Sequence, residues 1–229
     1  KYSEMERSKK GLEGAGEWHE LQKILPDFHD KKVLDLGCGY GWHCKYAANH
    51  GAASVLGIDI SHKMLNIAKQ KNKDEKTEYQ CIAMEDLDFE EASFDVIISS
   101  LAFHYVKDFE SLANNISKWL KQGGEFVFSV EHPVFTSYGT QDWYYDENGN
   151  ILHFPVDNYY YEGKREAVFL GEKVIKYHRT LTTYLNTLLK GFMLQHIIEP
   201  KPPQSMMHLE GMKDEMRRPM MLLLSFKKL

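Results

Sequence analysis

The stretch Val33-Leu34-Asp35-Leu36-Gly37-Cys38-Gly39-Tyr40-Gly41 decides the fold of this 229-residue chain. A short apolar run ends abruptly in glycines at alternating positions, which predicts a buried strand followed by a tight turn. Residues 42–50 then carry a helical pattern that ends at Gly51. A turn of this kind opens at a helix N-terminus on the carboxyl edge of the strands, where α/β proteins bind nucleotide-like ligands.

Working outward, the same alternation of strand and helix continues over the first 130 residues and returns with a helix from about residue 180. Further strands are expected at 54–59, 77–82, 94–99, 125–130, 193–198 and 220–226. Helices are expected after the N-cap residue Ser61, over about 109–121 and over about 180–190. Apolar strands separated by helices indicate a parallel sheet that is covered on both faces. We therefore predict a Rossmann-like α/β fold with a seven-stranded, mostly parallel sheet and an antiparallel last strand.

An aromatic segment interrupts this alternation after the fifth strand. Residues 133–177 contain eleven aromatic side chains and no convincing helix. Turn signals at 146–150 and 171–172 are flanked by strand-like runs, which predicts a hairpin-rich insertion. Its aromatics could form only a small second core. Its position after the fifth strand favours a lid that encloses a ligand.

Two carboxylates flank the glycine turn. Asp59 ends the second strand, where a carboxylate can accept hydrogen bonds from both hydroxyls of a ribose. Asp35 precedes the first glycine by two residues, and the spacing is G-x-G-x-G, not the dinucleotide pattern G-x-G-x-x-G. A carboxylate there suits the ammonium of S-adenosylmethionine better than a pyrophosphate. A nicotinamide or flavin nucleotide and a purely structural turn are the alternatives.

Four segments resemble motifs of the class I S-adenosylmethionine-dependent methyltransferases of the small-molecule type. They are 33–39 (VLDLGCG), 57–61 (GIDIS) with Met64-Leu65, 93–105 (SFDVIISSLAFHY) and 120–129 (LKQGGEFVFS). Further stretches between Arg7 and Pro219 resemble a bacterial subgroup of these enzymes, which brings no assigned substrate with it. The resemblance implies S-adenosylmethionine as methyl donor, S-adenosylhomocysteine as product and a small-molecule acceptor.

The resemblance also implies cofactor contacts for individual residues. Gly37 and Gly39 would contact the methionine moiety, Asp35 would hold its ammonium, and Asp59 would bind the ribose. Ala83 stands where the family often has an acidic residue for the adenine amino group. The backbone of Met84, or Glu85, would replace it. The other expected cofactor contacts are Trp18 with its neighbours Glu17 and His19, Cys38, Trp42, Ile60, Met64, Ser99, Ser100 and Leu101.

Methyl transfer is an in-line displacement at a sulfonium carbon, so the protein mainly aligns the acceptor and excludes water. A general base is needed only if the acceptor carries a proton. The candidates are His104, Glu131, His132 and His178, each with a structural role as the alternative, and convergence around one cavity would favour the catalytic role. The expected acceptor contacts are His104, Tyr105, Trp143, Tyr161 and Arg179. Arg179 would clamp a carboxylate or phosphate, or else close the insertion through a salt bridge.

These expectations divide the single domain 1–229 into four parts. They are a cofactor-covering segment (1–30), a cofactor-binding core (31–131), an aromatic substrate lid (132–178) and a C-terminal helix with two strands (179–229). Six of the ten methionines fall between Met206 and Met221, where core filling is predicted and pocket lining is the alternative. Whether Lys1 is the native first residue stays open.

The composition of the chain argues against several classes of binding partner. The chain is 43% hydrophobic and 27% charged with a net charge of −5, which argues against nucleic acid as a partner. No apolar run reaches 18 residues and no signal segment opens the chain, so we expect no membrane association and a cytoplasmic location. Three cysteines without metal-ligand spacing are expected to be reduced thiols, and no metal site is predicted. Both a monomer and a homodimer are compatible with the sequence.

Three rival functions are considered. A nucleic-acid methyltransferase that acts on base amino groups would carry a Pro-Pro-aromatic motif after the fourth strand. Residues 99–102 read Ser-Ser-Leu-Ala there. A binding module that holds S-adenosylmethionine without turnover is the second rival. A nicotinamide-dependent oxidoreductase is the third.

Overall fold

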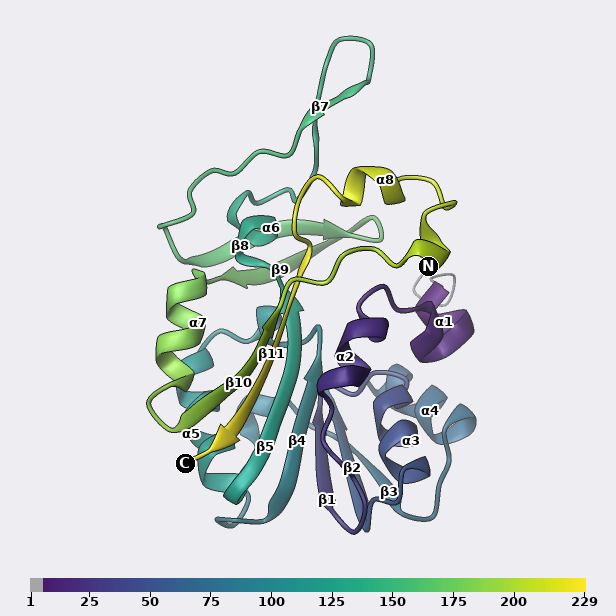
Figure 1. Ribbon diagram of the computed structural model, residues 1–229, viewed down its shortest axis with the longest axis vertical. Helices are drawn as coiled ribbons and strands as arrows, with labels where there is room; N and C mark the ends of the chain where they lie inside the picture. The colour runs from purple at the N-terminus through teal and green to yellow at the C-terminus, as the bar shows by residue number, and fades with distance from the viewer. Residues whose placement is uncertain (1–5) are drawn as a thin grey trace.

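A seven-stranded sheet forms the centre of the molecule (Figure 1). The computed structural model describes residues 6–229, so the first five residues of the predicted N-terminal segment lie outside the described residues. The strands are β1 (Lys32–Leu36), β2 (Ser54–Asp59), β3 (Thr77–Cys81), β4 (Phe94–Ser100), β5 (Leu120–Glu131), β10 (Phe192–Ile198) and β11 (Met221–Lys228). Their order is β10-β11-β5-β4-β1-β2-β3, and β11 runs antiparallel to both of its neighbours. The predicted Rossmann-like fold with an antiparallel last strand is confirmed.

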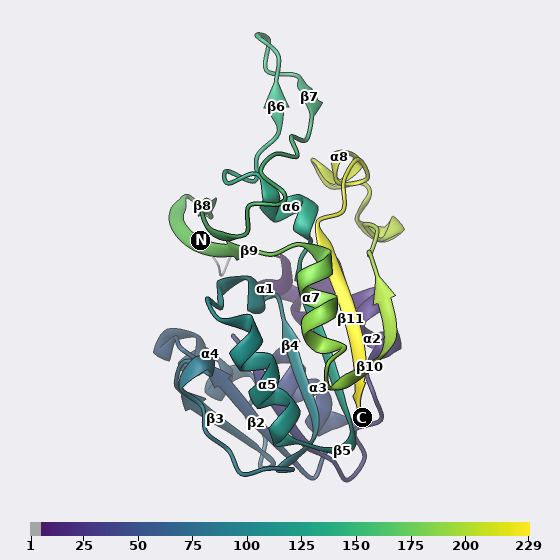
Figure 2. The same ribbon diagram turned by 90° about the vertical axis from the view of Figure 1, so that its left-hand side faces the viewer.

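Helices cover both faces of the sheet because successive residues of a buried strand point to opposite sides. Val33 of β1 packs with α2 (Trp18–Ile24), α3 (Trp42–Asn49) and α4 (His62–Lys71). Leu34 and Leu36 pack on the other face with α5 (Phe109–Trp119) and α7 (Leu181–Leu188). Figure 2, in which α5 and α7 face the viewer, shows this second layer. Each face therefore has its own apolar core, as continuous apolar strands require.

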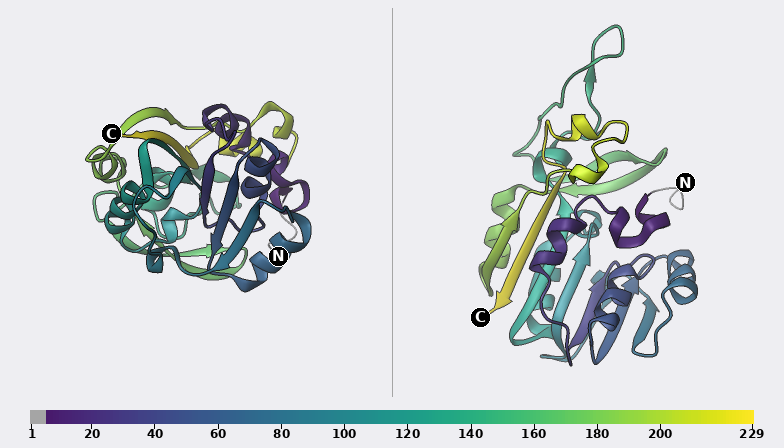
Figure 3. Two further views of the ribbon diagram at one scale, coloured as in Figure 1. Left: turned by 90° about the horizontal axis from the view of Figure 1, so that it is seen from below. Right: turned by 45° about the vertical axis from the view of Figure 1, so that its right-hand side comes forward.

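The insertion lies at the carboxyl edge of the sheet. It begins with α6 (Pro133–Ser137), continues through the small hairpin of β6 (Tyr144–Tyr145) and β7 (Ile151–His153), and ends with the hairpin of β8 (Gly163–Phe169) and β9 (Glu172–His178). The short helix α8 (Met212–Glu215) lies nearby. Figure 3 shows α1 (Glu6–Lys10) between the β8–β9 hairpin and the α3–α4 side of the core. The carboxyl edge of the sheet is thus covered by α1 and by the insertion.

Two local predictions are wrong. The helix expected to run to about residue 121 ends at Trp119, because Leu120 already has extended backbone and pairs with Phe94. The register then shifts so that Val96 lies beside Glu125, and the glycine pair 123–124 lies in this irregularity inside β5. The segment 133–177 also contains the five-residue helix α6, which has a proline at its first turn and His132 as its N-cap.

Among the described residues, no helix combines the length and the apolar character that crossing a bilayer requires.

Candidate active site

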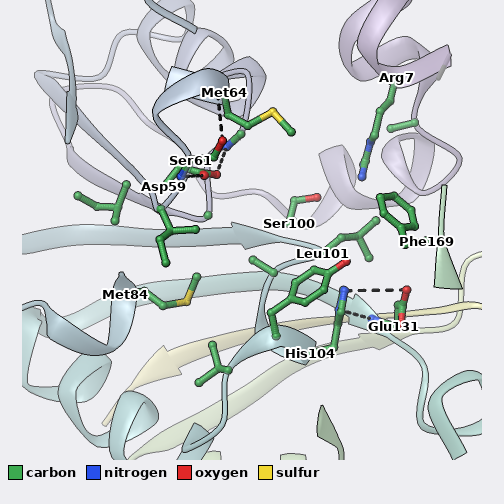
Figure 4. A pocket seen from close by; sticks show the side chains of 18 of the residues that line it. Arg7, Asp59, Ser61, Met64, Met84, Ser100, Leu101, His104, Glu131 and Phe169 are labelled. Atoms are coloured by element: carbon green, nitrogen blue, oxygen red, sulfur yellow. Dashed lines mark hydrogen bonds and ion pairs between the residues drawn. The ribbon is translucent and has the colours of Figure 1, made fainter. Parts of the chain in front are cut away.

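A cavity of about 590 Å³ opens at the carboxyl edge of β1, β2, β4 and β5 (Figure 4). This volume is typical of a pocket for a cofactor or small ligand. At one end lie the glycine turn after β1 and Asp59, the last residue of β2. At the other end lie the short helical turn η4 (Phe103–Tyr105), the end of β5 and the end of β8. We call these the cofactor end and the acceptor end.

The glycine turn offers space, not hydrogen-bond donors. The backbone N–H groups of Gly37 and Cys38 both donate to the carbonyl of Ile58 at 2.8 Å, and the N–H of Gly39 donates to Oδ2 of Asp59 at 2.9 Å. A Cβ atom on Gly39 would meet no atom within 4 Å, so the backbone borders open space. A pyrophosphate is normally held by free backbone N–H groups, and these three are already satisfied. The turn therefore suits a ligand without phosphate.

Asp59 connects the turn to the start of α4. Its Oδ1 accepts a hydrogen bond from the N–H of Ser61 at 2.8 Å, and the hydroxyl of Ser61 accepts from the N–H of Met64 to cap α4. The carboxylate is thereby oriented on the cavity wall, with lone pairs left for ribose hydroxyls. The neighbouring wall consists of Ile60, Met64, Ile82, Ala83, Met84 and Glu85. These side chains suit the flat, largely apolar faces of an adenine.

Asp35 lies beneath the turn and does not line the cavity. Its Oδ2 accepts a hydrogen bond from Sγ of Cys44 at 3.2 Å, whereas its Oδ1 is buried without a partner among the described residues. Burial raises the pKa of Asp35 to about 7, although the bond from Cys44 acts in the opposite direction. A positive charge brought close to this carboxyl would lower that pKa again.

Arg7 and Glu17 form an ion pair on the cavity wall that the sequence did not reveal. Glu17 is almost fully buried, and one of its carboxylate oxygens is paired with Arg7 and lies 3.3 Å from the hydroxyl of Ser100. Its other oxygen, Oε2, has no partner among the described residues. Figure 4 shows Arg7 pointing into the cavity toward Ser100. Opposite charges held side by side fit the zwitterionic end of an amino acid, including the methionine part of S-adenosylmethionine.

The acceptor end contains a buried polar cluster that joins the core to the insertion. Oε1 of Glu131, at the end of β5, lies 2.6 Å from Nζ of Lys176 on β9. The side-chain amide of Gln141 donates to Oε2 of Glu131 at 2.7 Å and accepts from Lys176 at 2.7 Å. His104 adds its Nε2, which lies 3.9 Å from Oε1 of Glu131. His104 and Glu131 line the cavity, and Lys176 lies behind them.

The charge states of this cluster follow from its contacts. The N–H of Glu131 donates to Nδ1 of His104 at 3.4 Å, so the proton of the neutral ring is on Nε2. Burial lowers the pKa of His104 to about 4, with Glu131 acting in the opposite direction. Burial alone would raise the pKa of Glu131, but His104, Lys176 and the hydrogen bonds bring it below its usual value. Near neutral pH the cluster holds a neutral imidazole and a carboxylate, and the carboxylate is paired with Lys176.

The four predicted catalytic residues do not converge. His104 and Glu131 share the cavity, whereas His132 and His178 are occupied elsewhere. Nδ1 of His132 accepts from the N–H of Val134 at the start of α6, and its Nε2 lies 2.8 Å from Glu199. The ring of His178 bridges Thr136 and the carbonyl of Tyr159, at 2.8 and 2.9 Å. Both histidines are placed to hold the insertion together.

Three predicted acceptor contacts also lie away from the cavity. Arg179 is buried and donates to the backbone carbonyls of Val106 and Lys107. Its guanidinium therefore holds the backbone, and it has no acidic partner among the described residues. Trp143 packs against the guanidinium of Arg218, 4.8 Å from its ring centroid. Tyr161 is 75% exposed on the outer surface. Of the predicted acceptor contacts, the structure places His104 and Tyr105 on the cavity.

Several predicted cofactor contacts lie behind the wall that they were expected to form. Gly37, Gly39, Asp59, Ile60, Met64, Met84, Glu85, Ser100 and Leu101 line the cavity. Trp18 is buried and its indole donates to Glu13, and the hydroxyl of Ser99 donates to the carbonyl of Leu36. The lining also does not include Cys38, Trp42 or His19. These residues lie beside cofactor motifs in the sequence, but neighbouring side chains of a strand or helix point in different directions, so theirs point away from the cavity.

Some lining residues had no strong signal in the sequence. Phe169 at the end of β8 and the pair Met220 and Met221 at the start of β11, where Met221 lies beside Glu131, complete the acceptor end. For the methionine-rich segment the sequence predicts core filling, with pocket lining as the alternative, and these two methionines line the cavity. Lys176 and Gln141 gave no signal at all, because nothing in the aromatic insertion marks one lysine among several.

Comparisons with known proteins decide the family. Residues 34–128 match a family model described as a methyltransferase domain. The chain is 55% identical to a Listeria monocytogenes crystal structure described as an S-adenosylmethionine-dependent methyltransferase, with 96% of this chain and 99% of that chain covered and a TM-score of 0.91. A Mesorhizobium loti S-adenosylmethionine-dependent methyltransferase is 39% identical, with 95% and 100% covered and a TM-score of 0.87.

The chain belongs to the class I S-adenosylmethionine-dependent methyltransferases. It is also 32% identical to a Haemophilus influenzae protein over 222 residues, 91% of this chain and 85% of the relative. A ubiquinone biosynthesis O-methyltransferase from Idiomarina loihiensis is 35% identical, over about half of either chain.

S-adenosylmethionine is the cofactor of this methyltransferase, and the observed site agrees with its chemistry. The N–H groups of Gly37, Cys38 and Gly39 already have acceptors, Gly39 borders open space, and one carboxylate oxygen of Glu17 has no partner among the described residues. The resemblance derived from the glycine turn is therefore confirmed at the level of family, cofactor and enzyme class.

Proposed function

We propose that this methyltransferase transfers the methyl group to a small molecule bound at the acceptor end of the cavity. The observation that supports the proposal is the closure of that end by the β8–β9 hairpin, through the buried contact of Glu131 with Lys176. A site closed by side chains of its own chain admits a small molecule more readily than a polymer. The name of the ubiquinone biosynthesis O-methyltransferase, which matches over about half of either chain, agrees with a small acceptor.

The residues around the cofactor end bind and orient, and we assign them no proton transfer. Asp59 would hold the ribose, and Arg7 with Glu17 would hold the carboxylate and ammonium of the methionine part. S-adenosylmethionine supplies, when bound, a methyl group already activated by a sulfonium. The chain then has to align an acceptor in line with that group and exclude water.

The same geometry gives His104 a role other than general base. Its Nδ1 is occupied by the N–H of Glu131, and its Nε2 carries the proton, so the ring offers a donor and no free lone pair to the cavity. Glu131 is held by Lys176 and Gln141. We infer that transfer relies on positioning, and that residues 6–30 and the insertion act as covers over cofactor and acceptor.

Isothermal titration calorimetry of the chain with S-adenosylmethionine, S-adenosylhomocysteine and NADH tests the cofactor end. We expect binding of the two adenosyl compounds and no binding of NADH. The acceptor is then sought by following S-adenosylhomocysteine release with pooled small molecules and with tRNA and DNA. Release that depends on a small molecule supports the proposal, and release that occurs only with nucleic acid contradicts it.

A further inference from the structure

The acceptor end carries a hydrogen-bond donor and an acceptor side by side. Nε2–H of His104 and Oε1 of Glu131 are 3.9 Å apart, which is too far for a direct hydrogen bond. Nδ1 of His104 is already occupied, so its Nε2–H is the donor that faces the cavity. Figure 4 shows both groups directed at the same part of the cavity, beside Leu101 and Phe169.

A single oxygen atom can bridge such a pair. An oxygen placed about 2.8 Å from both atoms would accept from Nε2–H and donate its own proton to the carboxylate. A hydroxyl group has both capacities on one atom. An ammonium group can only donate and would meet the Nε2–H donor, whereas a carboxylate can only accept and would meet Glu131.

The charge of the cluster also disfavours ionic acceptors. Lys176 is 2% exposed and neutralises Glu131 at 2.6 Å, while Gln141 holds both groups. The wall beside the pair includes the apolar side chains of Leu101 and Phe169 and the ring of Tyr105, whose centroid is 4.4 Å from that of His104, and the methionines 220 and 221 line the same cavity. An ion brought into this end would lose its hydration without gaining an unpaired counter-charge.

We propose that the acceptor is a neutral molecule that places a hydroxyl group between His104 and Glu131, and that Lys176 is the positioning residue that keeps this subsite neutral. The inference rests on the proposed function, since it names the substrate class of the same cavity. Lys176 acts through Glu131 and does not itself line the cavity.

The test uses three probes that share one ring and differ in charge: benzyl alcohol, benzylammonium and benzoate. Each is titrated at pH 7 into the full chain saturated with S-adenosylhomocysteine, and the shifts of the ¹³C-methyl signals of Met220 and Met221 report binding. We expect benzyl alcohol to bind about tenfold more tightly than either ion. Equal binding of the three probes, tighter binding of an ion, or no binding of benzyl alcohol overturns the inference.

Charge variants separate neutral recognition from a merely structural role. Lys176→Met leaves Glu131 unpaired and should turn the preference toward benzylammonium, whereas Glu131→Gln leaves Lys176 unpaired and should turn it toward benzoate. The double variant restores a neutral cluster and should again prefer benzyl alcohol. Lys164→Met, on the exposed surface of the same hairpin, is the matched control and should leave the preference unchanged.

The double variant keeps the test decisive if a single variant fails to fold, because it contains no unpaired buried charge. Unchanged probe preference in a single variant that folds overturns the role of Lys176, and so does a double variant that no longer prefers benzyl alcohol. Failure of the two proposals can be distinguished. If wild-type protein binds S-adenosylhomocysteine but shows no charge preference, only the acceptor class is wrong. If S-adenosylhomocysteine is released from S-adenosylmethionine only with nucleic acid as acceptor, the proposed function fails and this inference fails with it.

Discussion

The cofactor end and the acceptor end of the cavity are built in different ways. At the cofactor end, Gly39 and Asp59 are 20 residues apart and are joined through a backbone N–H group. At the acceptor end, Glu131 and Lys176 are 45 residues apart and are joined through two charged side chains. The first end needs only two neighbouring parallel strands and their turns. The second forms only when the β8–β9 hairpin docks on the core, so its stability depends on charge pairing.

The largest effect on stability should come from removing the buried ion pair at the acceptor end. Lys176→Met removes the partner of a buried carboxylate, and we expect the free energy of unfolding to fall by about 3–5 kcal/mol in urea titrations at pH 7. Lys164→Met removes a surface pair on the same hairpin and should stay within about 0.5 kcal/mol of wild type. Equal stabilities of these two variants would show that the buried pair does not hold the insertion.

Removing a ligand contact at the cofactor end should leave the chain folded and weaken the binding of the cofactor. Asp59→Ala deletes the carboxylate expected to bind the ribose, and two charge-assisted hydrogen bonds correspond to about a 100-fold loss of affinity for S-adenosylhomocysteine. Calorimetry measures this loss, with the exposed Glu91→Ala as control. An affinity within about twofold of wild type would refute the role of Asp59.

Two glycines of the turn allow loss of ligand affinity and loss of stability to be compared within one loop. A Cβ on Gly39 would enter open space, so Gly39→Ala should fold and should bind S-adenosylhomocysteine about tenfold more weakly. A Cβ on Gly37 would lie 2.5 Å from Cβ of Ala102, so Gly37→Ala should instead lower stability. Both glycines have positive φ, so each variant serves as the backbone control for the other. Wild-type affinity in Gly39→Ala would mean that the cofactor does not approach this backbone.

The smallest effect concerns pH. His104 has a pKa of about 4 in the folded chain and about 6.5 when unfolded, so the unfolded state binds more protons between these values. Its contribution to stability is complete above pH 6.5 and is lost as the pH falls toward 4. At pH 5.5 this amounts to about 1 kcal/mol.

The measurement is urea unfolding of wild type and His104→Asn at pH 7 and pH 5.5. Asp35, whose raised pKa makes the fold gain stability on acidification over the same range, acts oppositely in both proteins and cancels in the difference. Wild type should lose about 1 kcal/mol more than the variant on going to pH 5.5. Equal losses would show that His104 does not titrate as a buried neutral ring.

The same contrast explains which site residues could be predicted. The turn 37–39, Asp59 and Ser61 lie in motifs whose function depends on local backbone geometry, so their spacing carries the information. His104 and Glu131 could be placed near the site because each follows a strand that ends at the same edge. His132 and His178 follow strand ends as well, but α6 and the insertion turn their rings toward Glu199, Thr136 and Tyr159. Strand ends locate a region and not the direction of a side chain.

The sequence by itself determined the sheet, the glycine turn and the methyltransferase family, because these follow from hydrophobic periodicity and from residues close together along the chain. Only the tertiary structure decided which side chains close the acceptor end. Lys176 and Glu131 are 45 residues apart along the chain, and Met220 and Met221 reach the same cavity from the C-terminal segment, so packing alone brings them together. The physical reason is that a buried charge is stable only beside its partner, and the docked fold alone supplies that partner.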